Sequence, residues 1–394
     1  MFAHLFKLIW NKKKQNFLLM LEIFISFLVI FAVFTMIVYY YRNYKKPLGF
    51  DYENVWVIKY NNTLQTSNND SLSLFYETLK QTIKAMPQVK DITFTSYNIP
   101  MSQASSQSGF THNNEQFMGV NWYFVDDNYK NVLDMKMLEG RWFNKQDVVT
   151  KNHPVVINES LKERLFGNNP ATGKIIGDAR QQDKMHVIGV VEDIKQFGDY
   201  VNPGIAVFHK ADTSAFHWFG RMLVKVSPDA DATFESHLYK TIANYMRNAN
   251  IEIEHMDNNR KGINTFYLVP VIILLVVAIF LTINVTLGLF GVLWYNINKR
   301  KAEIGLRRAV GASGNSVSWQ LVAEALVLAT FSLFAGSFLA VQFPLLRIFD
   351  LPATIYITAL ILAILFIYLL VLLCSLYPGK QAAAVYPAVA LHED

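Results

Sequence analysis

The residues of this chain whose types and spacing best suit chemistry form one charged stretch, Lys299–Ser313, which reads KRKAEIGLRRAVGAS. Its first ten residues include one carboxylate, Glu303, and five cations: Lys299, Arg300, Lys301, Arg307 and Arg308. Charges at this density suit the binding of a partner protein better than catalysis. We expect a short amphipathic helix here, in which Ile304 and Val310 form an apolar strip and Gly311 ends the helix.

Other groupings that could support catalysis lack the required residues. The segment Gly167–Ile175 resembles a phosphate-binding loop, but its glycines are one residue too far apart and Ile175 replaces the magnesium-binding hydroxyl. The nine histidines show no metal-ligand spacing, and the serines of 102–108 lack a nucleophile elbow. We therefore predict no catalytic residue, no metal site and no cofactor site in this chain.

Composition places the chain among membrane proteins with a substantial soluble part, since 52% of its 394 residues are hydrophobic and 17% are charged. The net charge of +5 is small and no basic stripe with stacking aromatics occurs, which argues against nucleic-acid binding. Cys374 is the only cysteine, so no disulfide can form within the chain. Four apolar segments are long enough to cross a bilayer as helices: 17–41, 266–295, 317–343 and 354–377.

The charged stretch between the second and third spans fixes the predicted orientation. Short loops rich in lysine and arginine stay on the cytoplasmic side, and four crossings then put both termini there as well. Arg42, Lys45 and Lys46 at the outer end of the first span oppose this orientation, but the stretch 299–308 is the stronger signal. We predict that residues 1–41 form a helix along the inner surface and the first span, and that 42–265 lie outside the cytoplasm.

Residues 42–265 show the pattern of an α+β domain. The sequence strand–helix–strand occurs near both ends of this region, at 55–97 and again at 222–255. The middle is richer in strands, which we expect at 122–125, 154–158, 186–191 and 205–209. We therefore predict two subdomains, one built from about 42–120 and 211–265 and the other from about 121–210. The stretch Ser102–Gln116 is rich in serine, glutamine and asparagine and is expected to be a mobile loop.

Two carboxylates stand inside apolar segments, Glu22 in the first span and Glu324 in the third. Such groups either face a partner or a cavity, with a structural or coupling role, or extend to the inner interface. Close packing between helices is expected at four small residues: Gly288, Gly291, Gly336 and Ala340.

The second span is longer than a bilayer requires. Its thirty residues at about 1.5 Å each give about 45 Å, against a hydrocarbon core of about 30 Å. The helix should therefore protrude from the membrane or bend at Pro270, which lacks a backbone donor. The fourth span is expected to end at Tyr377 and Pro378.

Several phrases of the sequence together resemble the FtsX-like and MacB-like permeases, the membrane subunits of ABC systems. The stretch 299–313 is similar to their R-x-x-E-I-G-x-R-R-A-x-G-A signature, the most specific part of the resemblance. The phrases at 138–143, 155–167 and 187–191 occur in the order found in the MacB-like periplasmic core domain. The stretch 378–391 is similar to the P-x-x-x-A-x-x-x-P-x-x-A-L ending of these permeases.

The resemblance implies a four-span α-helical membrane domain, formed by the first span and 266–394, with a periplasmic α+β domain of two subdomains inserted between spans one and two. It assigns ATPase coupling to residues of the charged stretch: Arg300, Glu303, Ile304, Gly305, Arg307, Arg308 and Gly311. ATP and magnesium are expected on a separate cytoplasmic ABC ATPase. The other implied partners are a second permease copy or paralogue, membrane lipids, a periplasmic adaptor and an outer-membrane duct.

The implied function is that of a non-enzymatic subunit of the bacterial inner membrane, which passes ATP-driven motion to its periplasmic domain. That motion would export or extract a peptide, lipoprotein, toxin or drug. The alternative is a signalling scaffold that activates a cell-wall hydrolase, although relatives with that role usually carry a smaller outer domain. A membrane-tethered enzyme is a third interpretation, and it has no catalytic residues to support it.

Overall fold

The computed structural model describes residues 13–61, 68–149, 153–177, 184–211, 219–346 and 348–384. The chain divides into two compact units: an inserted domain, Arg42–Tyr267, and a helical unit made of Met1–Tyr41 with Leu268–Asp394. The helix predicted before Lys12 and the C-terminal ending from residue 385 onward lie outside the described residues.

The inserted domain is built on an 11-stranded mixed sheet, whose main path follows the order β11-β1-β10-β2-β4-β9-β6-β8-β5. Two further strands lie off this path: β3 pairs with β4, and β7 pairs with β8. The strands are β1 Val55–Tyr60, β2 Val89–Thr95, β3 Gln107–His112, β4 Glu115–Val125, β5 Met137–Gly140, β6 His153–Asn158, β7 Ile175–Ile176, β8 Met185–Val191, β9 Ala206–Lys210, β10 Arg221–Val226 and β11 Ile251–His255.

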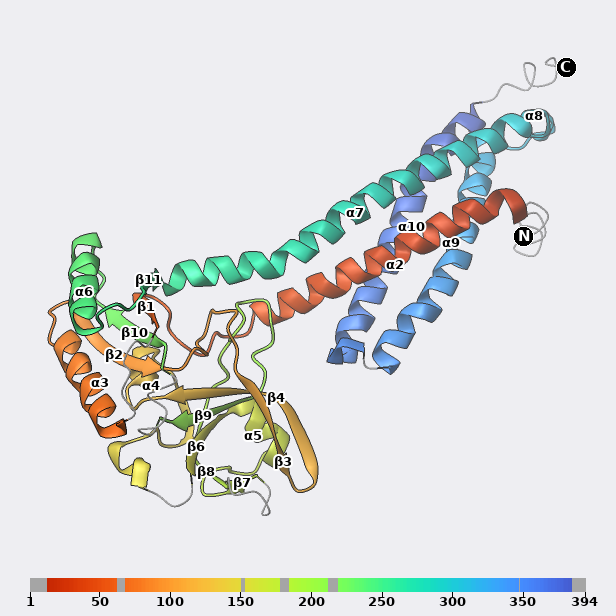
Figure 1. Ribbon diagram of the computed structural model, residues 1–394. Helices are drawn as coiled ribbons and strands as arrows, with labels where there is room; N and C mark the ends of the chain where they lie inside the picture. Colours follow the sequence, from red (N-terminus) through yellow and green to blue (C-terminus); the bar gives the residue numbers. More distant parts are fainter. Residues whose placement is uncertain are drawn as a thin grey trace. The chain divides into compact units, whose positions relative to one another are not determined.

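The first half of the sheet (β11, β1, β10 and β2) is formed from both ends of the domain, as the repeated strand–helix–strand pattern predicts. Two helices, α3 (Asn69–Lys84) and α6 (Ala232–Tyr245), lie next to each other beside these strands (Figure 1). The side chains that α3 buries recur every three or four residues, at Leu72, Tyr76, Leu79 and Ile83. Each helix starts at a side-chain cap, Asn68 for α3 and Asp231 for α6.

The second half of the sheet (β4, β9, β6, β8 and β5) is formed by the middle of the domain. It carries the helices α4 (Tyr129–Val132) and α5 (Glu159–Phe166) and a 3₁₀ turn, η1 (Lys145–Val149). In the sheet it is joined to the first half through one register pair, Thr95 with Val125. A buried core with residues from both halves, including Val57, Leu223 and Phe208, adds to this connection.

One sequence prediction for this domain is wrong: the stretch Ser102–Gln116 is not simply a mobile loop. From residue 107 it forms the β3–β4 hairpin, which turns at Asn113 and Asn114, both with positive φ (51° and 65°). That conformation is the one a tight two-residue hairpin turn requires. Phe110 and Phe117 stack with ring centroids 5.3 Å apart and are both buried. The burial of these two aromatic side chains stabilises the hairpin although the residues around them are polar.

The helical unit contains four helices that are long and apolar enough to cross a membrane, as judged from the described residues. They are α2 (Lys13–Tyr44), α7 (Met256–Lys299), α9 (Gly314–Leu345) and α10 (Ala353–Ala383), with the short helices α8 (Lys301–Ala309) and η3 (Ile348–Asp350) between them. The last residues of α2 and the first turns of α7 belong to the inserted domain.

Two helices extend beyond the spans predicted within them. The helix that contains the predicted second span is longer than that span, because α7 starts at Met256 directly after β11 and includes Pro270. The helix that contains the predicted fourth span continues past Pro378 to Ala383. Pro378 removes one backbone hydrogen bond, but close packing holds the extra turn. Gly379 lies so near Ser318 that a Cβ would come within 2.6 Å of its hydroxyl, and Ala382 is fully buried.

Three of the four predicted packing residues lie at contacts between helices. A Cβ added to Gly336 would lie 2.4 Å from the ring of Phe27, and Ala340 is buried in the same core. Gly288 leaves room for the carboxylate of Glu22, which would lie 2.6 Å from an added Cβ. Gly291 differs, because, apart from its chain neighbours and the backbone of its own helix, no described atom lies within 4 Å of the place where its Cβ would be.

We expect Gly336→Ala to destabilise the helical unit by about 1–3 kcal/mol, because Phe27 is fully buried and cannot move aside without disturbing its neighbours. The measurement is the free energy of unfolding in detergent. Gly291→Ala is the matched control, since it adds the same methyl group in open space and should leave stability unchanged or slightly raised. Equal stability of the two variants would show that the Phe27 contact is not tight.

Candidate functional site

The charged stretch folds as a helix–turn–helix connection with defined ends. Arg300 leaves helical geometry (φ −107°, ψ 14°) and separates α7 from α8. Gly311 has a φ of 105°, its N–H donates to the carbonyl of Arg308, and the N–H of Ala312 donates to that of Arg307. This pattern is a Schellman motif, in which glycine is favoured because of the positive φ. The hydroxyl of Ser313 then accepts a hydrogen bond from the N–H of Ser316 and caps α9.

Arg300 is the centre of the ion pairs in this connection. Its Nη1 donates to both carboxylate oxygens of Glu324 at 3.0 and 3.2 Å, and its Nε donates to Glu303 at 3.0 Å. The side chains of Arg300 and Glu324 are 14% and 15% exposed, so water screens this pair only partly. Burial opposes the charge of Arg300, but the bonds to the two carboxylates outweigh it and raise its pKa above the ordinary value.

A second set of contacts extends the network along α8. Arg307 donates to Glu303 at 2.6 Å, one helical turn away, and to the side-chain oxygen of Gln320 at 2.9 Å. Gln320 in turn donates to Glu324 at 3.3 Å. Arg308 donates to the backbone carbonyl of Ala383 at the end of α10. Such a contact satisfies a terminal carbonyl and places a cation at the negative end of the helix dipole.

The two faces of α8 are not those predicted. Ile304 is 6% exposed and packs in a small core with residues of three other helices: Ile297, Val317, Leu321 and Ala382. Val310 is 83% exposed, so Ile304 and Val310 do not form one strip. They are six positions apart in the sequence, which places them on different sides of a helix. The exposed apolar pair is Leu306 and Val310, four residues apart.

The structure brings together four of the residues that the sequence singled out: Arg300, Glu303, Arg307 and Glu324. Glu324 is therefore no isolated intramembrane carboxylate, because its charge is paired with Arg300. Glu22 lies elsewhere, against Gly288. Sequence reasoning missed Gln320 and Leu306, although the four-residue spacings Gln320–Glu324 and Leu306–Val310 are visible in the sequence.

The chemistry of this arrangement is that of a binding surface. Exposed Glu303 and Arg307 lie beside exposed Leu306 and Val310, while the buried side of α8 fixes the helix to α9 and α10. Across the described ranges, no group of three or more His, Cys, Asp or Glu side chains is placed to hold a metal ion. The charged connection can therefore present charges and apolar side chains to a partner protein.

A model of the MacB-like periplasmic core domain matches residues 16–236, and one of the FtsX-like permease C-terminal region matches residues 267–387. The macrolide export ATP-binding/permease protein MacB of Aggregatibacter actinomycetemcomitans is 26% identical over 253 residues, which are 62% of this chain and 39% of that protein. The chain thus spans well under half the length of this relative.

Two further proteins are similar. The uncharacterized ABC transporter permease YvrN of Bacillus subtilis is 23% identical over 333 residues, 81% of this chain and 79% of that protein. The crystal structure of the periplasmic region of MacB from Actinobacillus actinomycetemcomitans is 21% identical and covers 54% of this chain and 94% of that one, with a TM-score of 0.39.

The ion pairs of Arg300 generate a prediction about stability. Arg300→Met should cost more than Glu324→Met, because Arg300 keeps Glu303 when Glu324 is lost, whereas Glu324 would keep only Gln320 among the contacts described above. We expect about 3 kcal/mol for Arg300→Met and a smaller loss in the double variant than the sum of the two. The free energy of unfolding in detergent measures all three. Strict additivity would mean that the pair does not form.

Proposed function

We propose a function that proceeds from one premise: the chain belongs to the family of ABC transporter permeases that join a MacB-like periplasmic core domain to an FtsX-like permease domain. It is therefore a multi-pass protein of the bacterial inner membrane. In our proposal, α8 receives the motion of an ATP-hydrolysing partner, and the inserted domain uses that motion to export or extract a substrate from the periplasmic side.

The observation that carries this proposal is the surface of α8. Leu306 and Val310 are 56% and 83% exposed, although both are apolar, and Glu303 and Arg307 border them. An apolar pair ringed by charges is typical of an anchor in a protein interface. The buried side of the same helix packs against residues of α7, α9 and α10. A force applied to Leu306 and Val310 would therefore reach those helices.

The proposed orientation places α8 in the cytoplasm and the inserted domain in the periplasm. Its support is the density of cations in the short connection between α7 and α9, together with the four apolar helices. Both ends of the chain are then cytoplasmic. The cations that follow the first span, Arg42, Lys45 and Lys46, remain the weaker opposing signal.

The partners follow from the family and are part of the proposal. We expect a cytoplasmic ABC ATPase to bind ATP and magnesium, and a second copy or paralogue of this chain to complete a dimer in the lipid bilayer. A periplasmic adaptor and an outer-membrane duct would complete an export route. The names of the similar proteins refer to macrolide export and to a transporter permease, which favours export over the activation of a cell-wall hydrolase.

Exchanging the charges of Glu303 and Arg307 tests the proposal. These residues form an i,i+4 ion pair, so Glu303→Lys with Arg307→Glu keeps a pair within α8 but inverts the charges that a partner meets. Because charged groups at a desolvated contact are worth a few kcal/mol each, we expect a loss of about tenfold or more in ATPase activity that depends on this chain. The measurement is ATP hydrolysis by the complex in nanodiscs.

The matched control is the same exchange at Asp257 and Lys261, another exposed i,i+4 pair at the start of α7. This control should leave ATP hydrolysis unchanged. Unchanged hydrolysis in the Glu303–Arg307 exchange, with the variant correctly inserted, would mean that α8 is not the site of coupling.

A further inference from the structure

The loop that follows β8 in the inserted domain holds a buried lysine against the end of α2. Lys195 is 1% exposed, and its Nζ donates to the carbonyl oxygens of Asn43 at 2.6 Å, Lys46 at 2.8 Å and Asp199 at 3.0 Å. An ammonium group has three donors, and each has an acceptor here. Asn43 lies in the last turn of α2, where a cation is favoured, and its carbonyl also accepts a hydrogen bond from the N–H of Lys46 at 2.9 Å. Lys195 is therefore a buried cap for this helix.

Other contacts fix the same helix end to the loop. The side-chain amide of Asn43 donates to the carbonyl of Tyr200 at 3.2 Å, and the rings of Tyr44 and Tyr200 stack with centroids 5.9 Å apart. Lys46 donates to the side chain of Asn202 at 2.9 Å. Burial lowers the pKa of Lys195 to about 8, which reflects the cost of keeping a charge there. A core that needed only packing would be filled better by an apolar residue.

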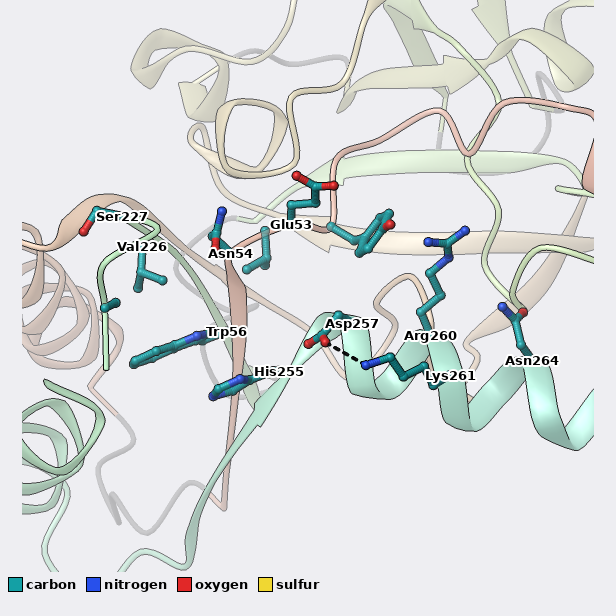
Figure 2. A pocket seen from close by; sticks show the side chains of 13 residues that line it. Glu53, Asn54, Trp56, Val226, Ser227, His255, Asp257, Arg260, Lys261 and Asn264 are labelled. Carbon is teal, nitrogen blue, oxygen red and sulfur yellow. Dashed lines mark hydrogen bonds and ion pairs between the residues drawn. The ribbon is translucent and has the colours of Figure 1, made fainter. Parts of the chain in front are cut away.

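Four residues along the loop, Asp199 holds the first turns of α7. Its carboxylate accepts two bonds from Arg260, at 3.0 and 2.8 Å, and one from the amide of Asn264 at 2.9 Å. The backbone N–H of Asp199 donates to the same Asn264 at 2.9 Å. Figure 2 shows Arg260 and Asn264 on the first turns of α7. Both residues line a pocket of about 580 Å³.

The approach of the loop to α7 is too close for most residues. Gly198 has a φ of +87°, and a Cβ there would lie 2.5 Å from the side-chain oxygen of Asn264. Asp199 takes part in both sets of contacts, because its carbonyl accepts a hydrogen bond from Lys195 and its carboxylate accepts hydrogen bonds from Arg260 of α7. One short loop thus binds the end of α2 and the start of α7 at the same time.

The loop connects α2 and α7 to a part of the sheet to which neither helix is joined directly along the chain. Along the chain, α2 leads to β1 and α7 follows β11, so both helices are covalently joined to the first half of the sheet. Lys195 and Asp199 instead follow β8, which belongs to the second half. Among the described residues, the sheet joins the two halves at one register pair, Thr95 with Val125. The loop therefore supplies a direct polar connection between the helices and the second half.

We propose that the loop 195–200 is a clamp that passes movement of α2 and α7 to the second half of the inserted domain, with Lys195 and Asp199 as its positioning residues. The clamp rests on the proposed function, because it transmits the motion that α8 receives. It assigns a mechanical role to the second half of the sheet. That half is otherwise joined to the helices through β2, β4, the shared core and hydrogen bonds such as the one from the N–H of Asp51 to the carbonyl of Leu133 at 2.7 Å.

The test measures hydrogen exchange in the complex of the full chain and its ATPase in nanodiscs. Two conditions are compared: ATP with vanadate, and no nucleotide. The variants are Lys195→Met, which keeps the size of the side chain, and Asp199→Asn, which removes the charge that Arg260 meets. Lys136→Met is the control, because Lys136 lies in the same half but is 69% exposed and pairs only at the surface, with Glu192. Protection of β6 and β8 without nucleotide reports whether each variant is folded.

In the wild type and in Lys136→Met, we expect nucleotide to change exchange at α8, at the first turns of α7 and in β5, β6 and β8. In Lys195→Met and Asp199→Asn, the nucleotide-dependent change in exchange should persist at α8. In β5, β6 and β8 it should fall to half of the wild-type change or less. If the change in these strands persists in both variants, the clamp is wrong and the proposed function stands. If the wild type shows no change even at α8, the proposed function fails and the clamp fails with it.

Discussion

At each end of α7, an arginine forms an ion pair with a carboxylate that is largely buried. The rest of the structure depends on these two ion pairs. At the start of the helix, Arg260 binds Asp199, which is 4% exposed, inside the inserted domain. Directly after the helix, Arg300 binds Glu324 and Glu303 inside the helical unit. A shielded pair of this kind is costly to break, because the residue left behind is a charge without a partner. Each end of α7 is therefore held firmly within its own unit.

These interactions explain why α7 can remain helical through a poor sequence. Its first turns contain three asparagines and Gly262, which favour a turn over a helix. Arg260 and Asn264 bind Asp199 from one side of the helix, and Met256 and Ile263 are buried in the core of the inserted domain. Tertiary contacts thus override local preference. A helix held in this way can transmit displacement, whereas a frayed one would absorb it.

The sequence predicted those features that arise from local pattern. The four spans, the strands at 55–60 and 251–255 and the helices α3 and α6 follow from apolar length or periodicity, and the structure has them. It could not predict contacts between distant residues, such as Lys195 with Asn43 or Arg300 with Glu324, because nothing in a single sequence links them. The β3–β4 hairpin was missed for a different reason: its Asn-Asn turn signal lies within polar composition that favours a loop.

Transmission of motion from α8 to the inserted domain requires that α8 be cytoplasmic and the inserted domain periplasmic. The labelling of single cysteines in intact cells measures this orientation directly. In a Cys374→Ala background, Ser105→Cys and Ala312→Cys place thiols at exposed positions before β3 and after α8. A membrane-impermeant maleimide should label Ser105→Cys in intact cells and Ala312→Cys only after permeabilisation. Labelling of Ala312→Cys in intact cells, with Ser105→Cys protected, would contradict a cytoplasmic coupling helix and a periplasmic inserted domain.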